Sequence, residues 1–266
     1  MSSLDRIPEE VEGDEEVVSS LVDFTNAWKR AALETGNYLT WHEKTLKLCA
    51  DDMIPVWAAE SARREAADAA AKGCEERPLA FVFDLDEVLL SNVACQGACR
   101  AGLGVFYPAD HFYVADRPWP RRERFSPALP GARELLAAAA EFGDVAIVTG
   151  RAESLRDETV DNLVAVGLAT PDGAEARSAA DIGLPPLDEG TPVLDAALMR
   201  AGPPLIMCPD GRLPRAGESI EPFKRAARVS ISRTHRICAI FGDQVSDMGV
   251  EGDVSMVVHN PFYFTL

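Results

Sequence analysis

One short stretch constrains the fold of this chain more than any other. Residues 79–92 read LAFVFDLDEVLLSN, an apolar run that ends in two aspartates, Asp84 and Asp86. Such a run is typical of a strand buried on both faces, as in a parallel sheet. Residues that follow the strand then lie at its carboxyl end, where open α/β sheets bind ligands. Two carboxylates there favour phosphoryl transfer, although acids in this position also cap helices or lie in solvated turns.

Three further segments carry polar groups that suit an anionic ligand. DVAIVTGR ends with Thr149 and Gly150, SIEPFKRAARVSI contains Lys224, and RICAIFGDQVSD contains Asp243 and Asp247. A hydroxyl, backbone amides and a lysine can hold an anion, whereas carboxylates can hold a cation. Each residue also has a purely structural interpretation, as a strand end, a solvated helix residue or a helix cap. Their joint occurrence in this order, after apolar runs, favours one shared site.

The order of these motifs resembles the haloacid dehalogenase (HAD) superfamily, which has an Asp-x-Asp, a Thr or Ser, a Lys and a late acidic pair. Further segments look like its acid phosphatase branch, subfamily IIIB: LLSN, SPALPGARELL, TGRAESLRDETVDNLVAVG, LIMCP, FGDQVSDM and HNPFYF. The resemblance covers residues 78–266. It departs at Val88, where Thr is usual, and at Cys208, where relatives often carry other residues.

The resemblance implies a Mg²⁺-dependent phosphomonoesterase that works through an aspartyl-phosphate intermediate. Asp84 would be the nucleophile and a metal ligand. Asp86 would give its backbone carbonyl to the metal and act as general acid and base through its side chain. Asp243 would complete the metal ligands, and Asp247 would orient metal-bound water or Lys224 from behind them.

The same resemblance implies a site for the transferring phosphoryl group. Thr149, the amide of Gly150 and Lys224 would bind its oxygens. Arg151 is also expected to bind phosphate, with pairing to an acid on the next helix as the alternative. Asp86 argues against dehalogenation, because a departing halide needs no proton and such relatives generally lack this second aspartate.

The expected substrates are small phosphate monoesters. Nucleoside monophosphates are one candidate class, because the segment 92–126 carries aromatic side chains that could hold a nucleobase or could simply anchor a long loop. These aromatic residues are Phe106, Tyr107, Phe112, Tyr113 and Trp119, and His111 lies among them. Two alternatives stay open: a specialised biosynthetic phosphatase or phosphotransferase, and a non-catalytic storage or interaction member of the family. The intact Asp84 favours an enzyme.

Strand and helix signals alternate from residue 79, which predicts an α/β fold: a HAD-type, Rossmann-like parallel sheet flanked by helices. Strands are expected near 79–85, 144–149, 204–208, 236–241 and 254–258, and helices near 131–142, 153–167, 191–201 and 217–230. The motif spacing leaves little room for a large inserted cap. We expect a flexible acidic N-terminus at 1–16, an N-terminal helical region at 17–75 and the catalytic domain at 76–266.

The charge of the chain and its cysteines limit the kinds of partner and the compartment that we expect. The chain has 43 acidic and 26 basic residues, a net charge of -17, which argues against nucleic acid or an anionic membrane as a main partner. No apolar run approaches the roughly 20 residues that span a bilayer. The acidic start lacks the features of a signal peptide, so we expect a cytoplasmic protein whose six cysteines are thiols. Cys95 and Cys99 are more simply packing residues than a metal or redox pair. A homo-oligomer is compatible with the sequence.

Overall fold

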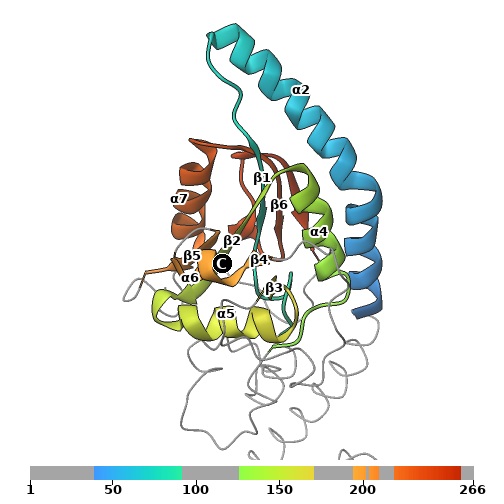
Figure 1. The fold of residues 1–266 in the computed structure, drawn as a ribbon, viewed down its shortest axis with the longest axis vertical. Coiled ribbons are helices and arrows are strands. Elements are labelled where there is room, and N and C mark those ends of the chain that lie inside the picture. Colours follow the sequence, from blue (N-terminus) through green and yellow to red (C-terminus); the bar gives the residue numbers. More distant parts are fainter. Residues whose placement is uncertain (1–38, 92–125, 171–193, 202–203, 210–218, 259–266) are drawn as a thin grey trace, which may run out of the picture.

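The computed structural model describes residues 39–91, 126–170, 194–201, 204–209 and 219–258 (Figure 1). Its centre is a parallel sheet of five strands in the order β5-β2-β1-β6-β7. The strands are β1 (Leu79–Phe83), β2 (Asp144–Ala152), β5 (Leu205–Cys208), β6 (Arg236–Gly242) and β7 (Gly252–Val257). All five correspond to strands expected from the sequence, so the predicted α/β fold with a parallel, helix-flanked sheet is confirmed.

Strand β1 lies in the middle of the sheet and sets the position of the site. It pairs with β2 on one side, Phe83 opposite Ile147, and with β6 on the other, Phe83 opposite Phe241. Residues just after β1 and β6 therefore emerge side by side at one edge. On the other side of β1, the pairing of β2 with β5 is interrupted between Thr149 and Ala152. Irregularities of this kind redirect side chains near the ends of strands.

Helices cover both faces of the sheet, because the side chains of β1 alternate between two cores. Phe81 and Phe83 belong to the larger core, shared with α2 (Ile54–Lys72) and α4 (Ala132–Phe142). Val82 faces the smaller core, which contains Ala227 of α7 (Glu221–Ser232). The period-two alternation of a strand thus produces three layers, with α7 on one face of the sheet and α2 and α4 on the other.

The N-terminal helical region is packed on the catalytic fold. Residues 39–48 form a helix that continues through a π-helical turn, η2 (Cys49–Met53), into α2. The π turn precedes Pro55, which has no N–H for the regular helical ladder. Leu46 and Ile54 are fully buried in the larger core, and His42 Nε2 lies 3.3 Å from the carbonyl oxygen of Glu87. This region therefore touches the loop that follows Asp86.

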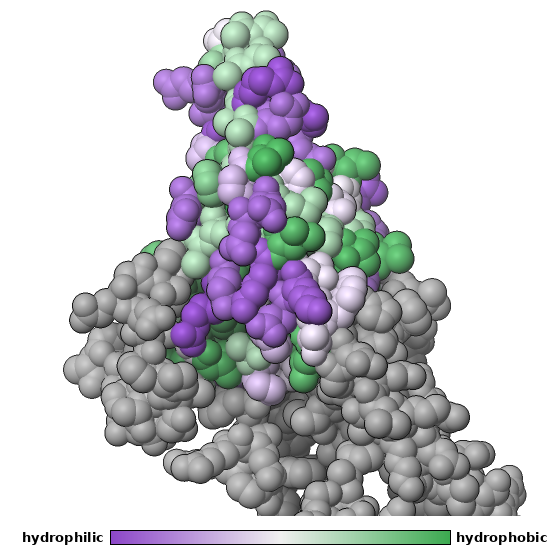
Figure 2. All heavy atoms as spheres, turned by 90° about the vertical axis from the view of Figure 1, so that its right-hand side faces the viewer, coloured by the Kyte–Doolittle hydropathy of each residue, from purple (hydrophilic) through white to green (hydrophobic). Residues whose placement is uncertain are grey.

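Hydrophilic side chains lie along the outward side of α2, with apolar ones between them (Figure 2). The buried residues of α2 are Ile54, Ala58, Ser61, Glu65 and Ala69. The carboxyl-terminal end of α2 projects past the amino ends of the strands and stops at Gly73, whose φ of 66° suits glycine (Figure 1). About two turns before the end of α2, Glu65 is buried and accepts hydrogen bonds from Arg77 and Arg236. These bonds tie α2 to the amino-terminal ends of the sheet.

The remaining elements lie at the carboxyl end of the fold. They are η6 (Glu153–Leu155), α5 (Arg156–Ala165), α6 (Ala196–Ala201) and a small parallel pair, β3 (Ala169–Thr170) with β4 (Leu194–Asp195). The helices were expected, whereas two-residue strands carry too little pattern to be predicted. Within the described segments, no helix is long and apolar enough to cross a membrane. The expected segment 1–16, residues 17–38 of the helical region, residues 92–125 of the segment 92–126 and the pair Cys95 and Cys99 fall outside the described residues.

Candidate active site

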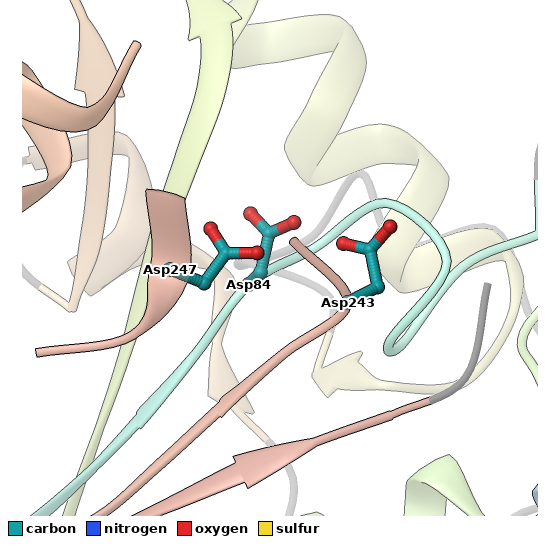
Figure 3. A group of neighbouring side chains, drawn as sticks. All are labelled: Asp84, Asp243 and Asp247. Carbon is teal, nitrogen blue, oxygen red and sulfur yellow. The ribbon is translucent and has the colours of Figure 1, made fainter. Parts of the chain in front are cut away.

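Three predicted acids meet at the carboxyl edge of the sheet. Asp84 directly follows β1, Asp243 directly follows β6, and Asp247 ends the short helix η9 (Val245–Asp247). All three are buried, and one carboxylate oxygen of each lies within 4.8 Å of those of the other two. Figure 3 shows the three carboxyl groups pointing into the same space. The parallel order of β1 and β6 therefore brings together residues about 160 positions apart.

Backbone contacts hold the acids in place. The amide of Asp84 donates to the carbonyl of Phe241 at 2.8 Å, which fixes the end of β1 against β6. Gly242 permits the close approach of Asp247, because a Cβ at position 242 would lie 2.1 Å from the Asp247 Cβ. Asp247 Oδ2 accepts the Gln244 amide at 3.0 Å and so caps η9. The capping interpretation of Asp247 is thus correct for one oxygen, and the other oxygen faces the site.

Lys224 provides the positive charge that the sequence predicted. It lies on the first turn of α7, is 5% exposed, and donates from Nζ to Asp84 Oδ1 at 2.9 Å and to Asp247 Oδ1. Burial alone would lower the pKa of Lys224, but the carboxylates of Asp247 and Asp84 raise it above its ordinary value. Lys224 is therefore a permanent cation between two acids and not a solvated helix residue.

One lysine does not balance the negative charge around it. Burial, together with the charges of Asp247, Asp243 and Asp86, raises the pKa of Asp84 well above its ordinary value, although Lys224 opposes that change. A cavity of about 10 Å³ beside these groups is lined by Asp84, Lys224, Arg228 and Asp247 with apolar neighbours. This volume is at the limit for a single water molecule.

These residues fit a hard divalent cation. Three buried carboxylates converge, and Mg²⁺ prefers oxygen ligands of this kind. A second positive charge would offset the burial and the mutual repulsion that together raise the pKa of Asp84. The donor set therefore suits the divalent metal that HAD phosphatases generally use.

The segment that is expected to bind phosphate lies on β2, the strand that pairs with β1. Thr149 is fully buried, and its Oγ1 accepts the Arg151 amide at 3.2 Å. Gly150 is not required by space, since an added Cβ would meet Ile220 only at an ordinary 3.5 Å.

Arg151 forms an ion pair with Asp86. Its guanidinium is 1% exposed and forms a forked ion pair with Asp86, from Nε at 3.0 Å and from Nη2 at 2.6 Å. Nη1 also lies 3.4 Å from Thr159 Oγ1 on α5. The guanidinium thus contacts the aspartate that is expected to move protons.

Sequence reasoning missed three other residues at this edge. Gln244 donates to Asp243 Oδ2 at 2.5 Å, Arg228 is buried behind Asp247, and Glu87 has a left-handed φ of 60° directly after Asp86. The spacing of Lys224 and Arg228, one helical turn apart, was an available signal for the second. Nothing in the sequence marked Glu87, since left-handed backbone is expected mainly of glycine. Such conformations often occur at functional sites.

The two departures from the family pattern have simple packing explanations. Val88 is fully buried in the larger core, where a methyl group replaces the hydroxyl of the usual threonine without exposing apolar surface. Cys208 is buried at the end of β5, opposite Ala152. His111 and the aromatic residues of 92–126 lie outside the described residues.

A family model identifies the chain. Residues 16–183 match the HAD superfamily, subfamily IIIB (acid phosphatase). This range contains Asp84, Asp86 and Thr149–Arg151, and the fold then adds Lys224 and the late acids beyond it. The chain belongs to this family, so the predicted class of enzyme, a phosphoric monoester hydrolase, is confirmed.

The comparison with solved structures found class C acid phosphatases. The enzyme from Bacillus anthracis is 20% identical with a TM-score of 0.43, covering 85% of this chain and 87% of that one. The same enzyme with tungstate bound gives 20% identity and a TM-score of 0.41, covering 84% and 85%. The search of curated proteins found no match.

Proposed function

We propose that this phosphatase is Mg²⁺-dependent and hydrolyses small phosphate monoesters through an aspartyl-phosphate on Asp84. The observation that carries the proposal is the buried cluster of Asp84, Asp243 and Asp247 with Lys224 at the carboxyl edge of the sheet. Asp84, Asp243 and the backbone carbonyl of Asp86 would hold the metal. When bound, Mg²⁺ would offset the charges of the nucleophile and of the phosphate that approaches it.

The first step forms a bond between an Asp84 carboxylate oxygen and phosphorus. The bond from phosphorus to the leaving oxygen breaks, and that oxygen takes a proton from Asp86. Thr149, the amide of Gly150 and Lys224 bind the phosphoryl oxygens as charge spreads over them. Lys224 suits this role because its Nζ already lies 2.9 Å from Asp84.

In the second step Asp86 accepts a proton instead of donating one. Asp86 accepts a proton from water while the water oxygen attacks phosphorus and the bond to Asp84 breaks, releasing inorganic phosphate. Both steps need the Asp86 carboxylate in one orientation. We assign that task to Arg151, whose forked contact fixes both Asp86 oxygens.

The experiment is phosphate release from nucleoside monophosphates, sugar phosphates and an aryl phosphate, with Mg²⁺ or with EDTA. Wild type should release phosphate only with metal, Asp84→Asn should be inactive yet folded, and the ranking of substrates identifies their class. Asp52→Asn, an exposed acid on η2, is the matched control and should behave as wild type. Turnover by Asp84→Asn near the wild-type rate would refute the assigned nucleophile.

A further inference from the structure

A second buried cation lies on α7 and has no part in the chemistry described above. Arg228 follows Lys224 by four residues, so both side chains leave the same face of the helix. Arg228 is 1% exposed, and it is among the largest fully buried side chains of the described segments. Burying a guanidinium is unfavourable unless its donors are satisfied, so its contacts indicate what it does.

The contacts of Arg228 surround Asp247 along the chain. Nη1 donates to the Ser246 carbonyl at 3.1 Å, and Nη2 donates to the Met248 carbonyl at 2.9 Å. Nε donates to Glu251 Oε2 at 3.2 Å, and the Glu251 side chain is 8% exposed. One guanidinium thus holds the residues immediately before and after Asp247, and Glu251 holds the guanidinium.

Gly249 leaves the space in which Arg228 and Glu251 meet. A Cβ added there would lie 2.0 Å from Glu251 Oε2 and 2.7 Å from Arg228 Nε. Any other residue at position 249 would therefore force the ends of the arginine and glutamate side chains to move. Arg228, Glu251 and Gly249 form a unit, which we call the loop latch.

The loop latch affects metal binding because it holds in place a loop that carries two of the clustered aspartates. Asp84, Asp243 and Asp247 repel one another, and the loop 243–251 carries two of the three. Lys224 already ties Asp247 to Asp84. If the rest of the loop were free to relax when no cation is bound, cation binding would have to draw it back. A loop already held in place avoids that cost, which is the general effect of preorganisation on affinity.

We propose that the loop latch sets the affinity of the site for a divalent cation, with Arg228 as a positioning residue that touches neither metal nor substrate. The inference rests on the proposed metal site at Asp84, Asp243 and the backbone carbonyl of Asp86. Groups that orient metal ligands from behind typically contribute roughly 10- to 100-fold to metal affinity, and we expect a loss of that size for Arg228→Gln.

The test measures Mg²⁺ binding to the full chain by calorimetry, and Mn²⁺ binding by electron paramagnetic resonance, without substrate. Arg225→Gln is the matched control, because Arg225 also faces Glu251, with Nε 3.7 Å from Oε1, but its side chain is 64% exposed. Arg228→Gln should weaken binding and Arg225→Gln should not. Arg228→Lys should fall between them, since one ammonium cannot replace a guanidinium fork.

Folding is checked by thermal unfolding in EDTA. If Arg228→Gln does not fold, Gly249→Ala disturbs the same latch with the arginine retained and should also weaken metal binding. Wild-type affinity in either folded variant would overturn the latch while leaving the metal site intact. Absence of binding by wild type, or unchanged binding by Asp243→Asn, would overturn the metal site itself, so the two failures are distinguishable.

Discussion

Replacing Glu65 by glutamine tests how the projecting helix α2 is held to the catalytic fold. Glu65 is 4% exposed and accepts from the Arg77 amide at 3.0 Å, from Arg77 Nε at 2.9 Å and from Nη2 at 2.7 Å. Arg236 Nη1 adds a contact at 3.4 Å. Hydrogen bonds from Arg77 are the main reason that the pKa of Glu65 falls from its ordinary 4.5 to about 2.

The size of the effect follows from this pKa. Each tenfold change in proton affinity is worth about 1.36 kcal/mol, so the whole difference would be roughly 3.4 kcal/mol. The Arg77 side chain is 34% exposed, and water screens part of the attraction. We therefore expect Glu65→Gln to lower the free energy of unfolding by about 1–2 kcal/mol at neutral pH. For a chain of this size the corresponding fall in Tm is about 2–8 °C.

The stabilisation by Glu65 should also depend on pH. Because the folded pKa lies below the unfolded one, ionised Glu65 stabilises the fold fully above pH 4.5, and this contribution is lost as the pH falls from 4.5 towards about 2. Urea unfolding of wild type and Glu65→Gln should thus converge over that window. Glu60→Gln is the control, since Glu60 pairs with Arg63 and Arg64 on the exposed side of α2. A loss no larger than that of the control, or one that is unchanged in acid, would refute the reasoning.

Three further substitutions address the site. Asp243→Asn should raise the Mg²⁺ concentration for half-maximal activity by roughly tenfold or more, because proteins usually bind Mg²⁺ through only a few carboxylates. An unchanged metal titration would remove Asp243 from the ligands. Arg151→Gln should slow the hydrolysis of alkyl phosphates by up to about 100-fold, and the hydrolysis of an activated aryl phosphate far less, because a good leaving group needs little proton donation from Asp86. Equal losses of activity on both substrates would contradict that role of Arg151. Gly242→Ala should cost about 1–3 kcal/mol in urea unfolding, because its Cβ would overlap Asp247, and wild-type stability would show that the loop can move aside.

The fold was predictable because its strongest signals are local. The apolar runs at β1, β2 and β6 are long enough to be assigned without tertiary information, and each ends next to a polar motif. The pair β3 and β4 was missed because two residues carry no period. The π turn before Pro55 was missed because its cause, a lost donor, predicts a disturbance but not its form.

The convergence of Asp84 and Asp243 was predictable from the sequence, but the side-chain contacts around them were not. Strand ends place Asp84 and Asp243 at one edge, so their meeting follows from topology. The pairing of Arg151 with Asp86 depends on side-chain direction at an interrupted strand, which sequence does not encode locally. Gly242 was missed for a related reason, since its need is set by the approach of Asp247 and not by its own backbone conformation.

The most direct test of the account is to trap the covalent intermediate. The enzyme is mixed with Mg²⁺ and an aryl phosphate, quenched in acid and treated with borohydride, which reduces an aspartyl phosphate to homoserine, and the modified residue is located by mass spectrometry. The account predicts homoserine at position 84 in wild type and none in Asp84→Asn. Active enzyme with no modification, or with a modified residue elsewhere, would contradict it.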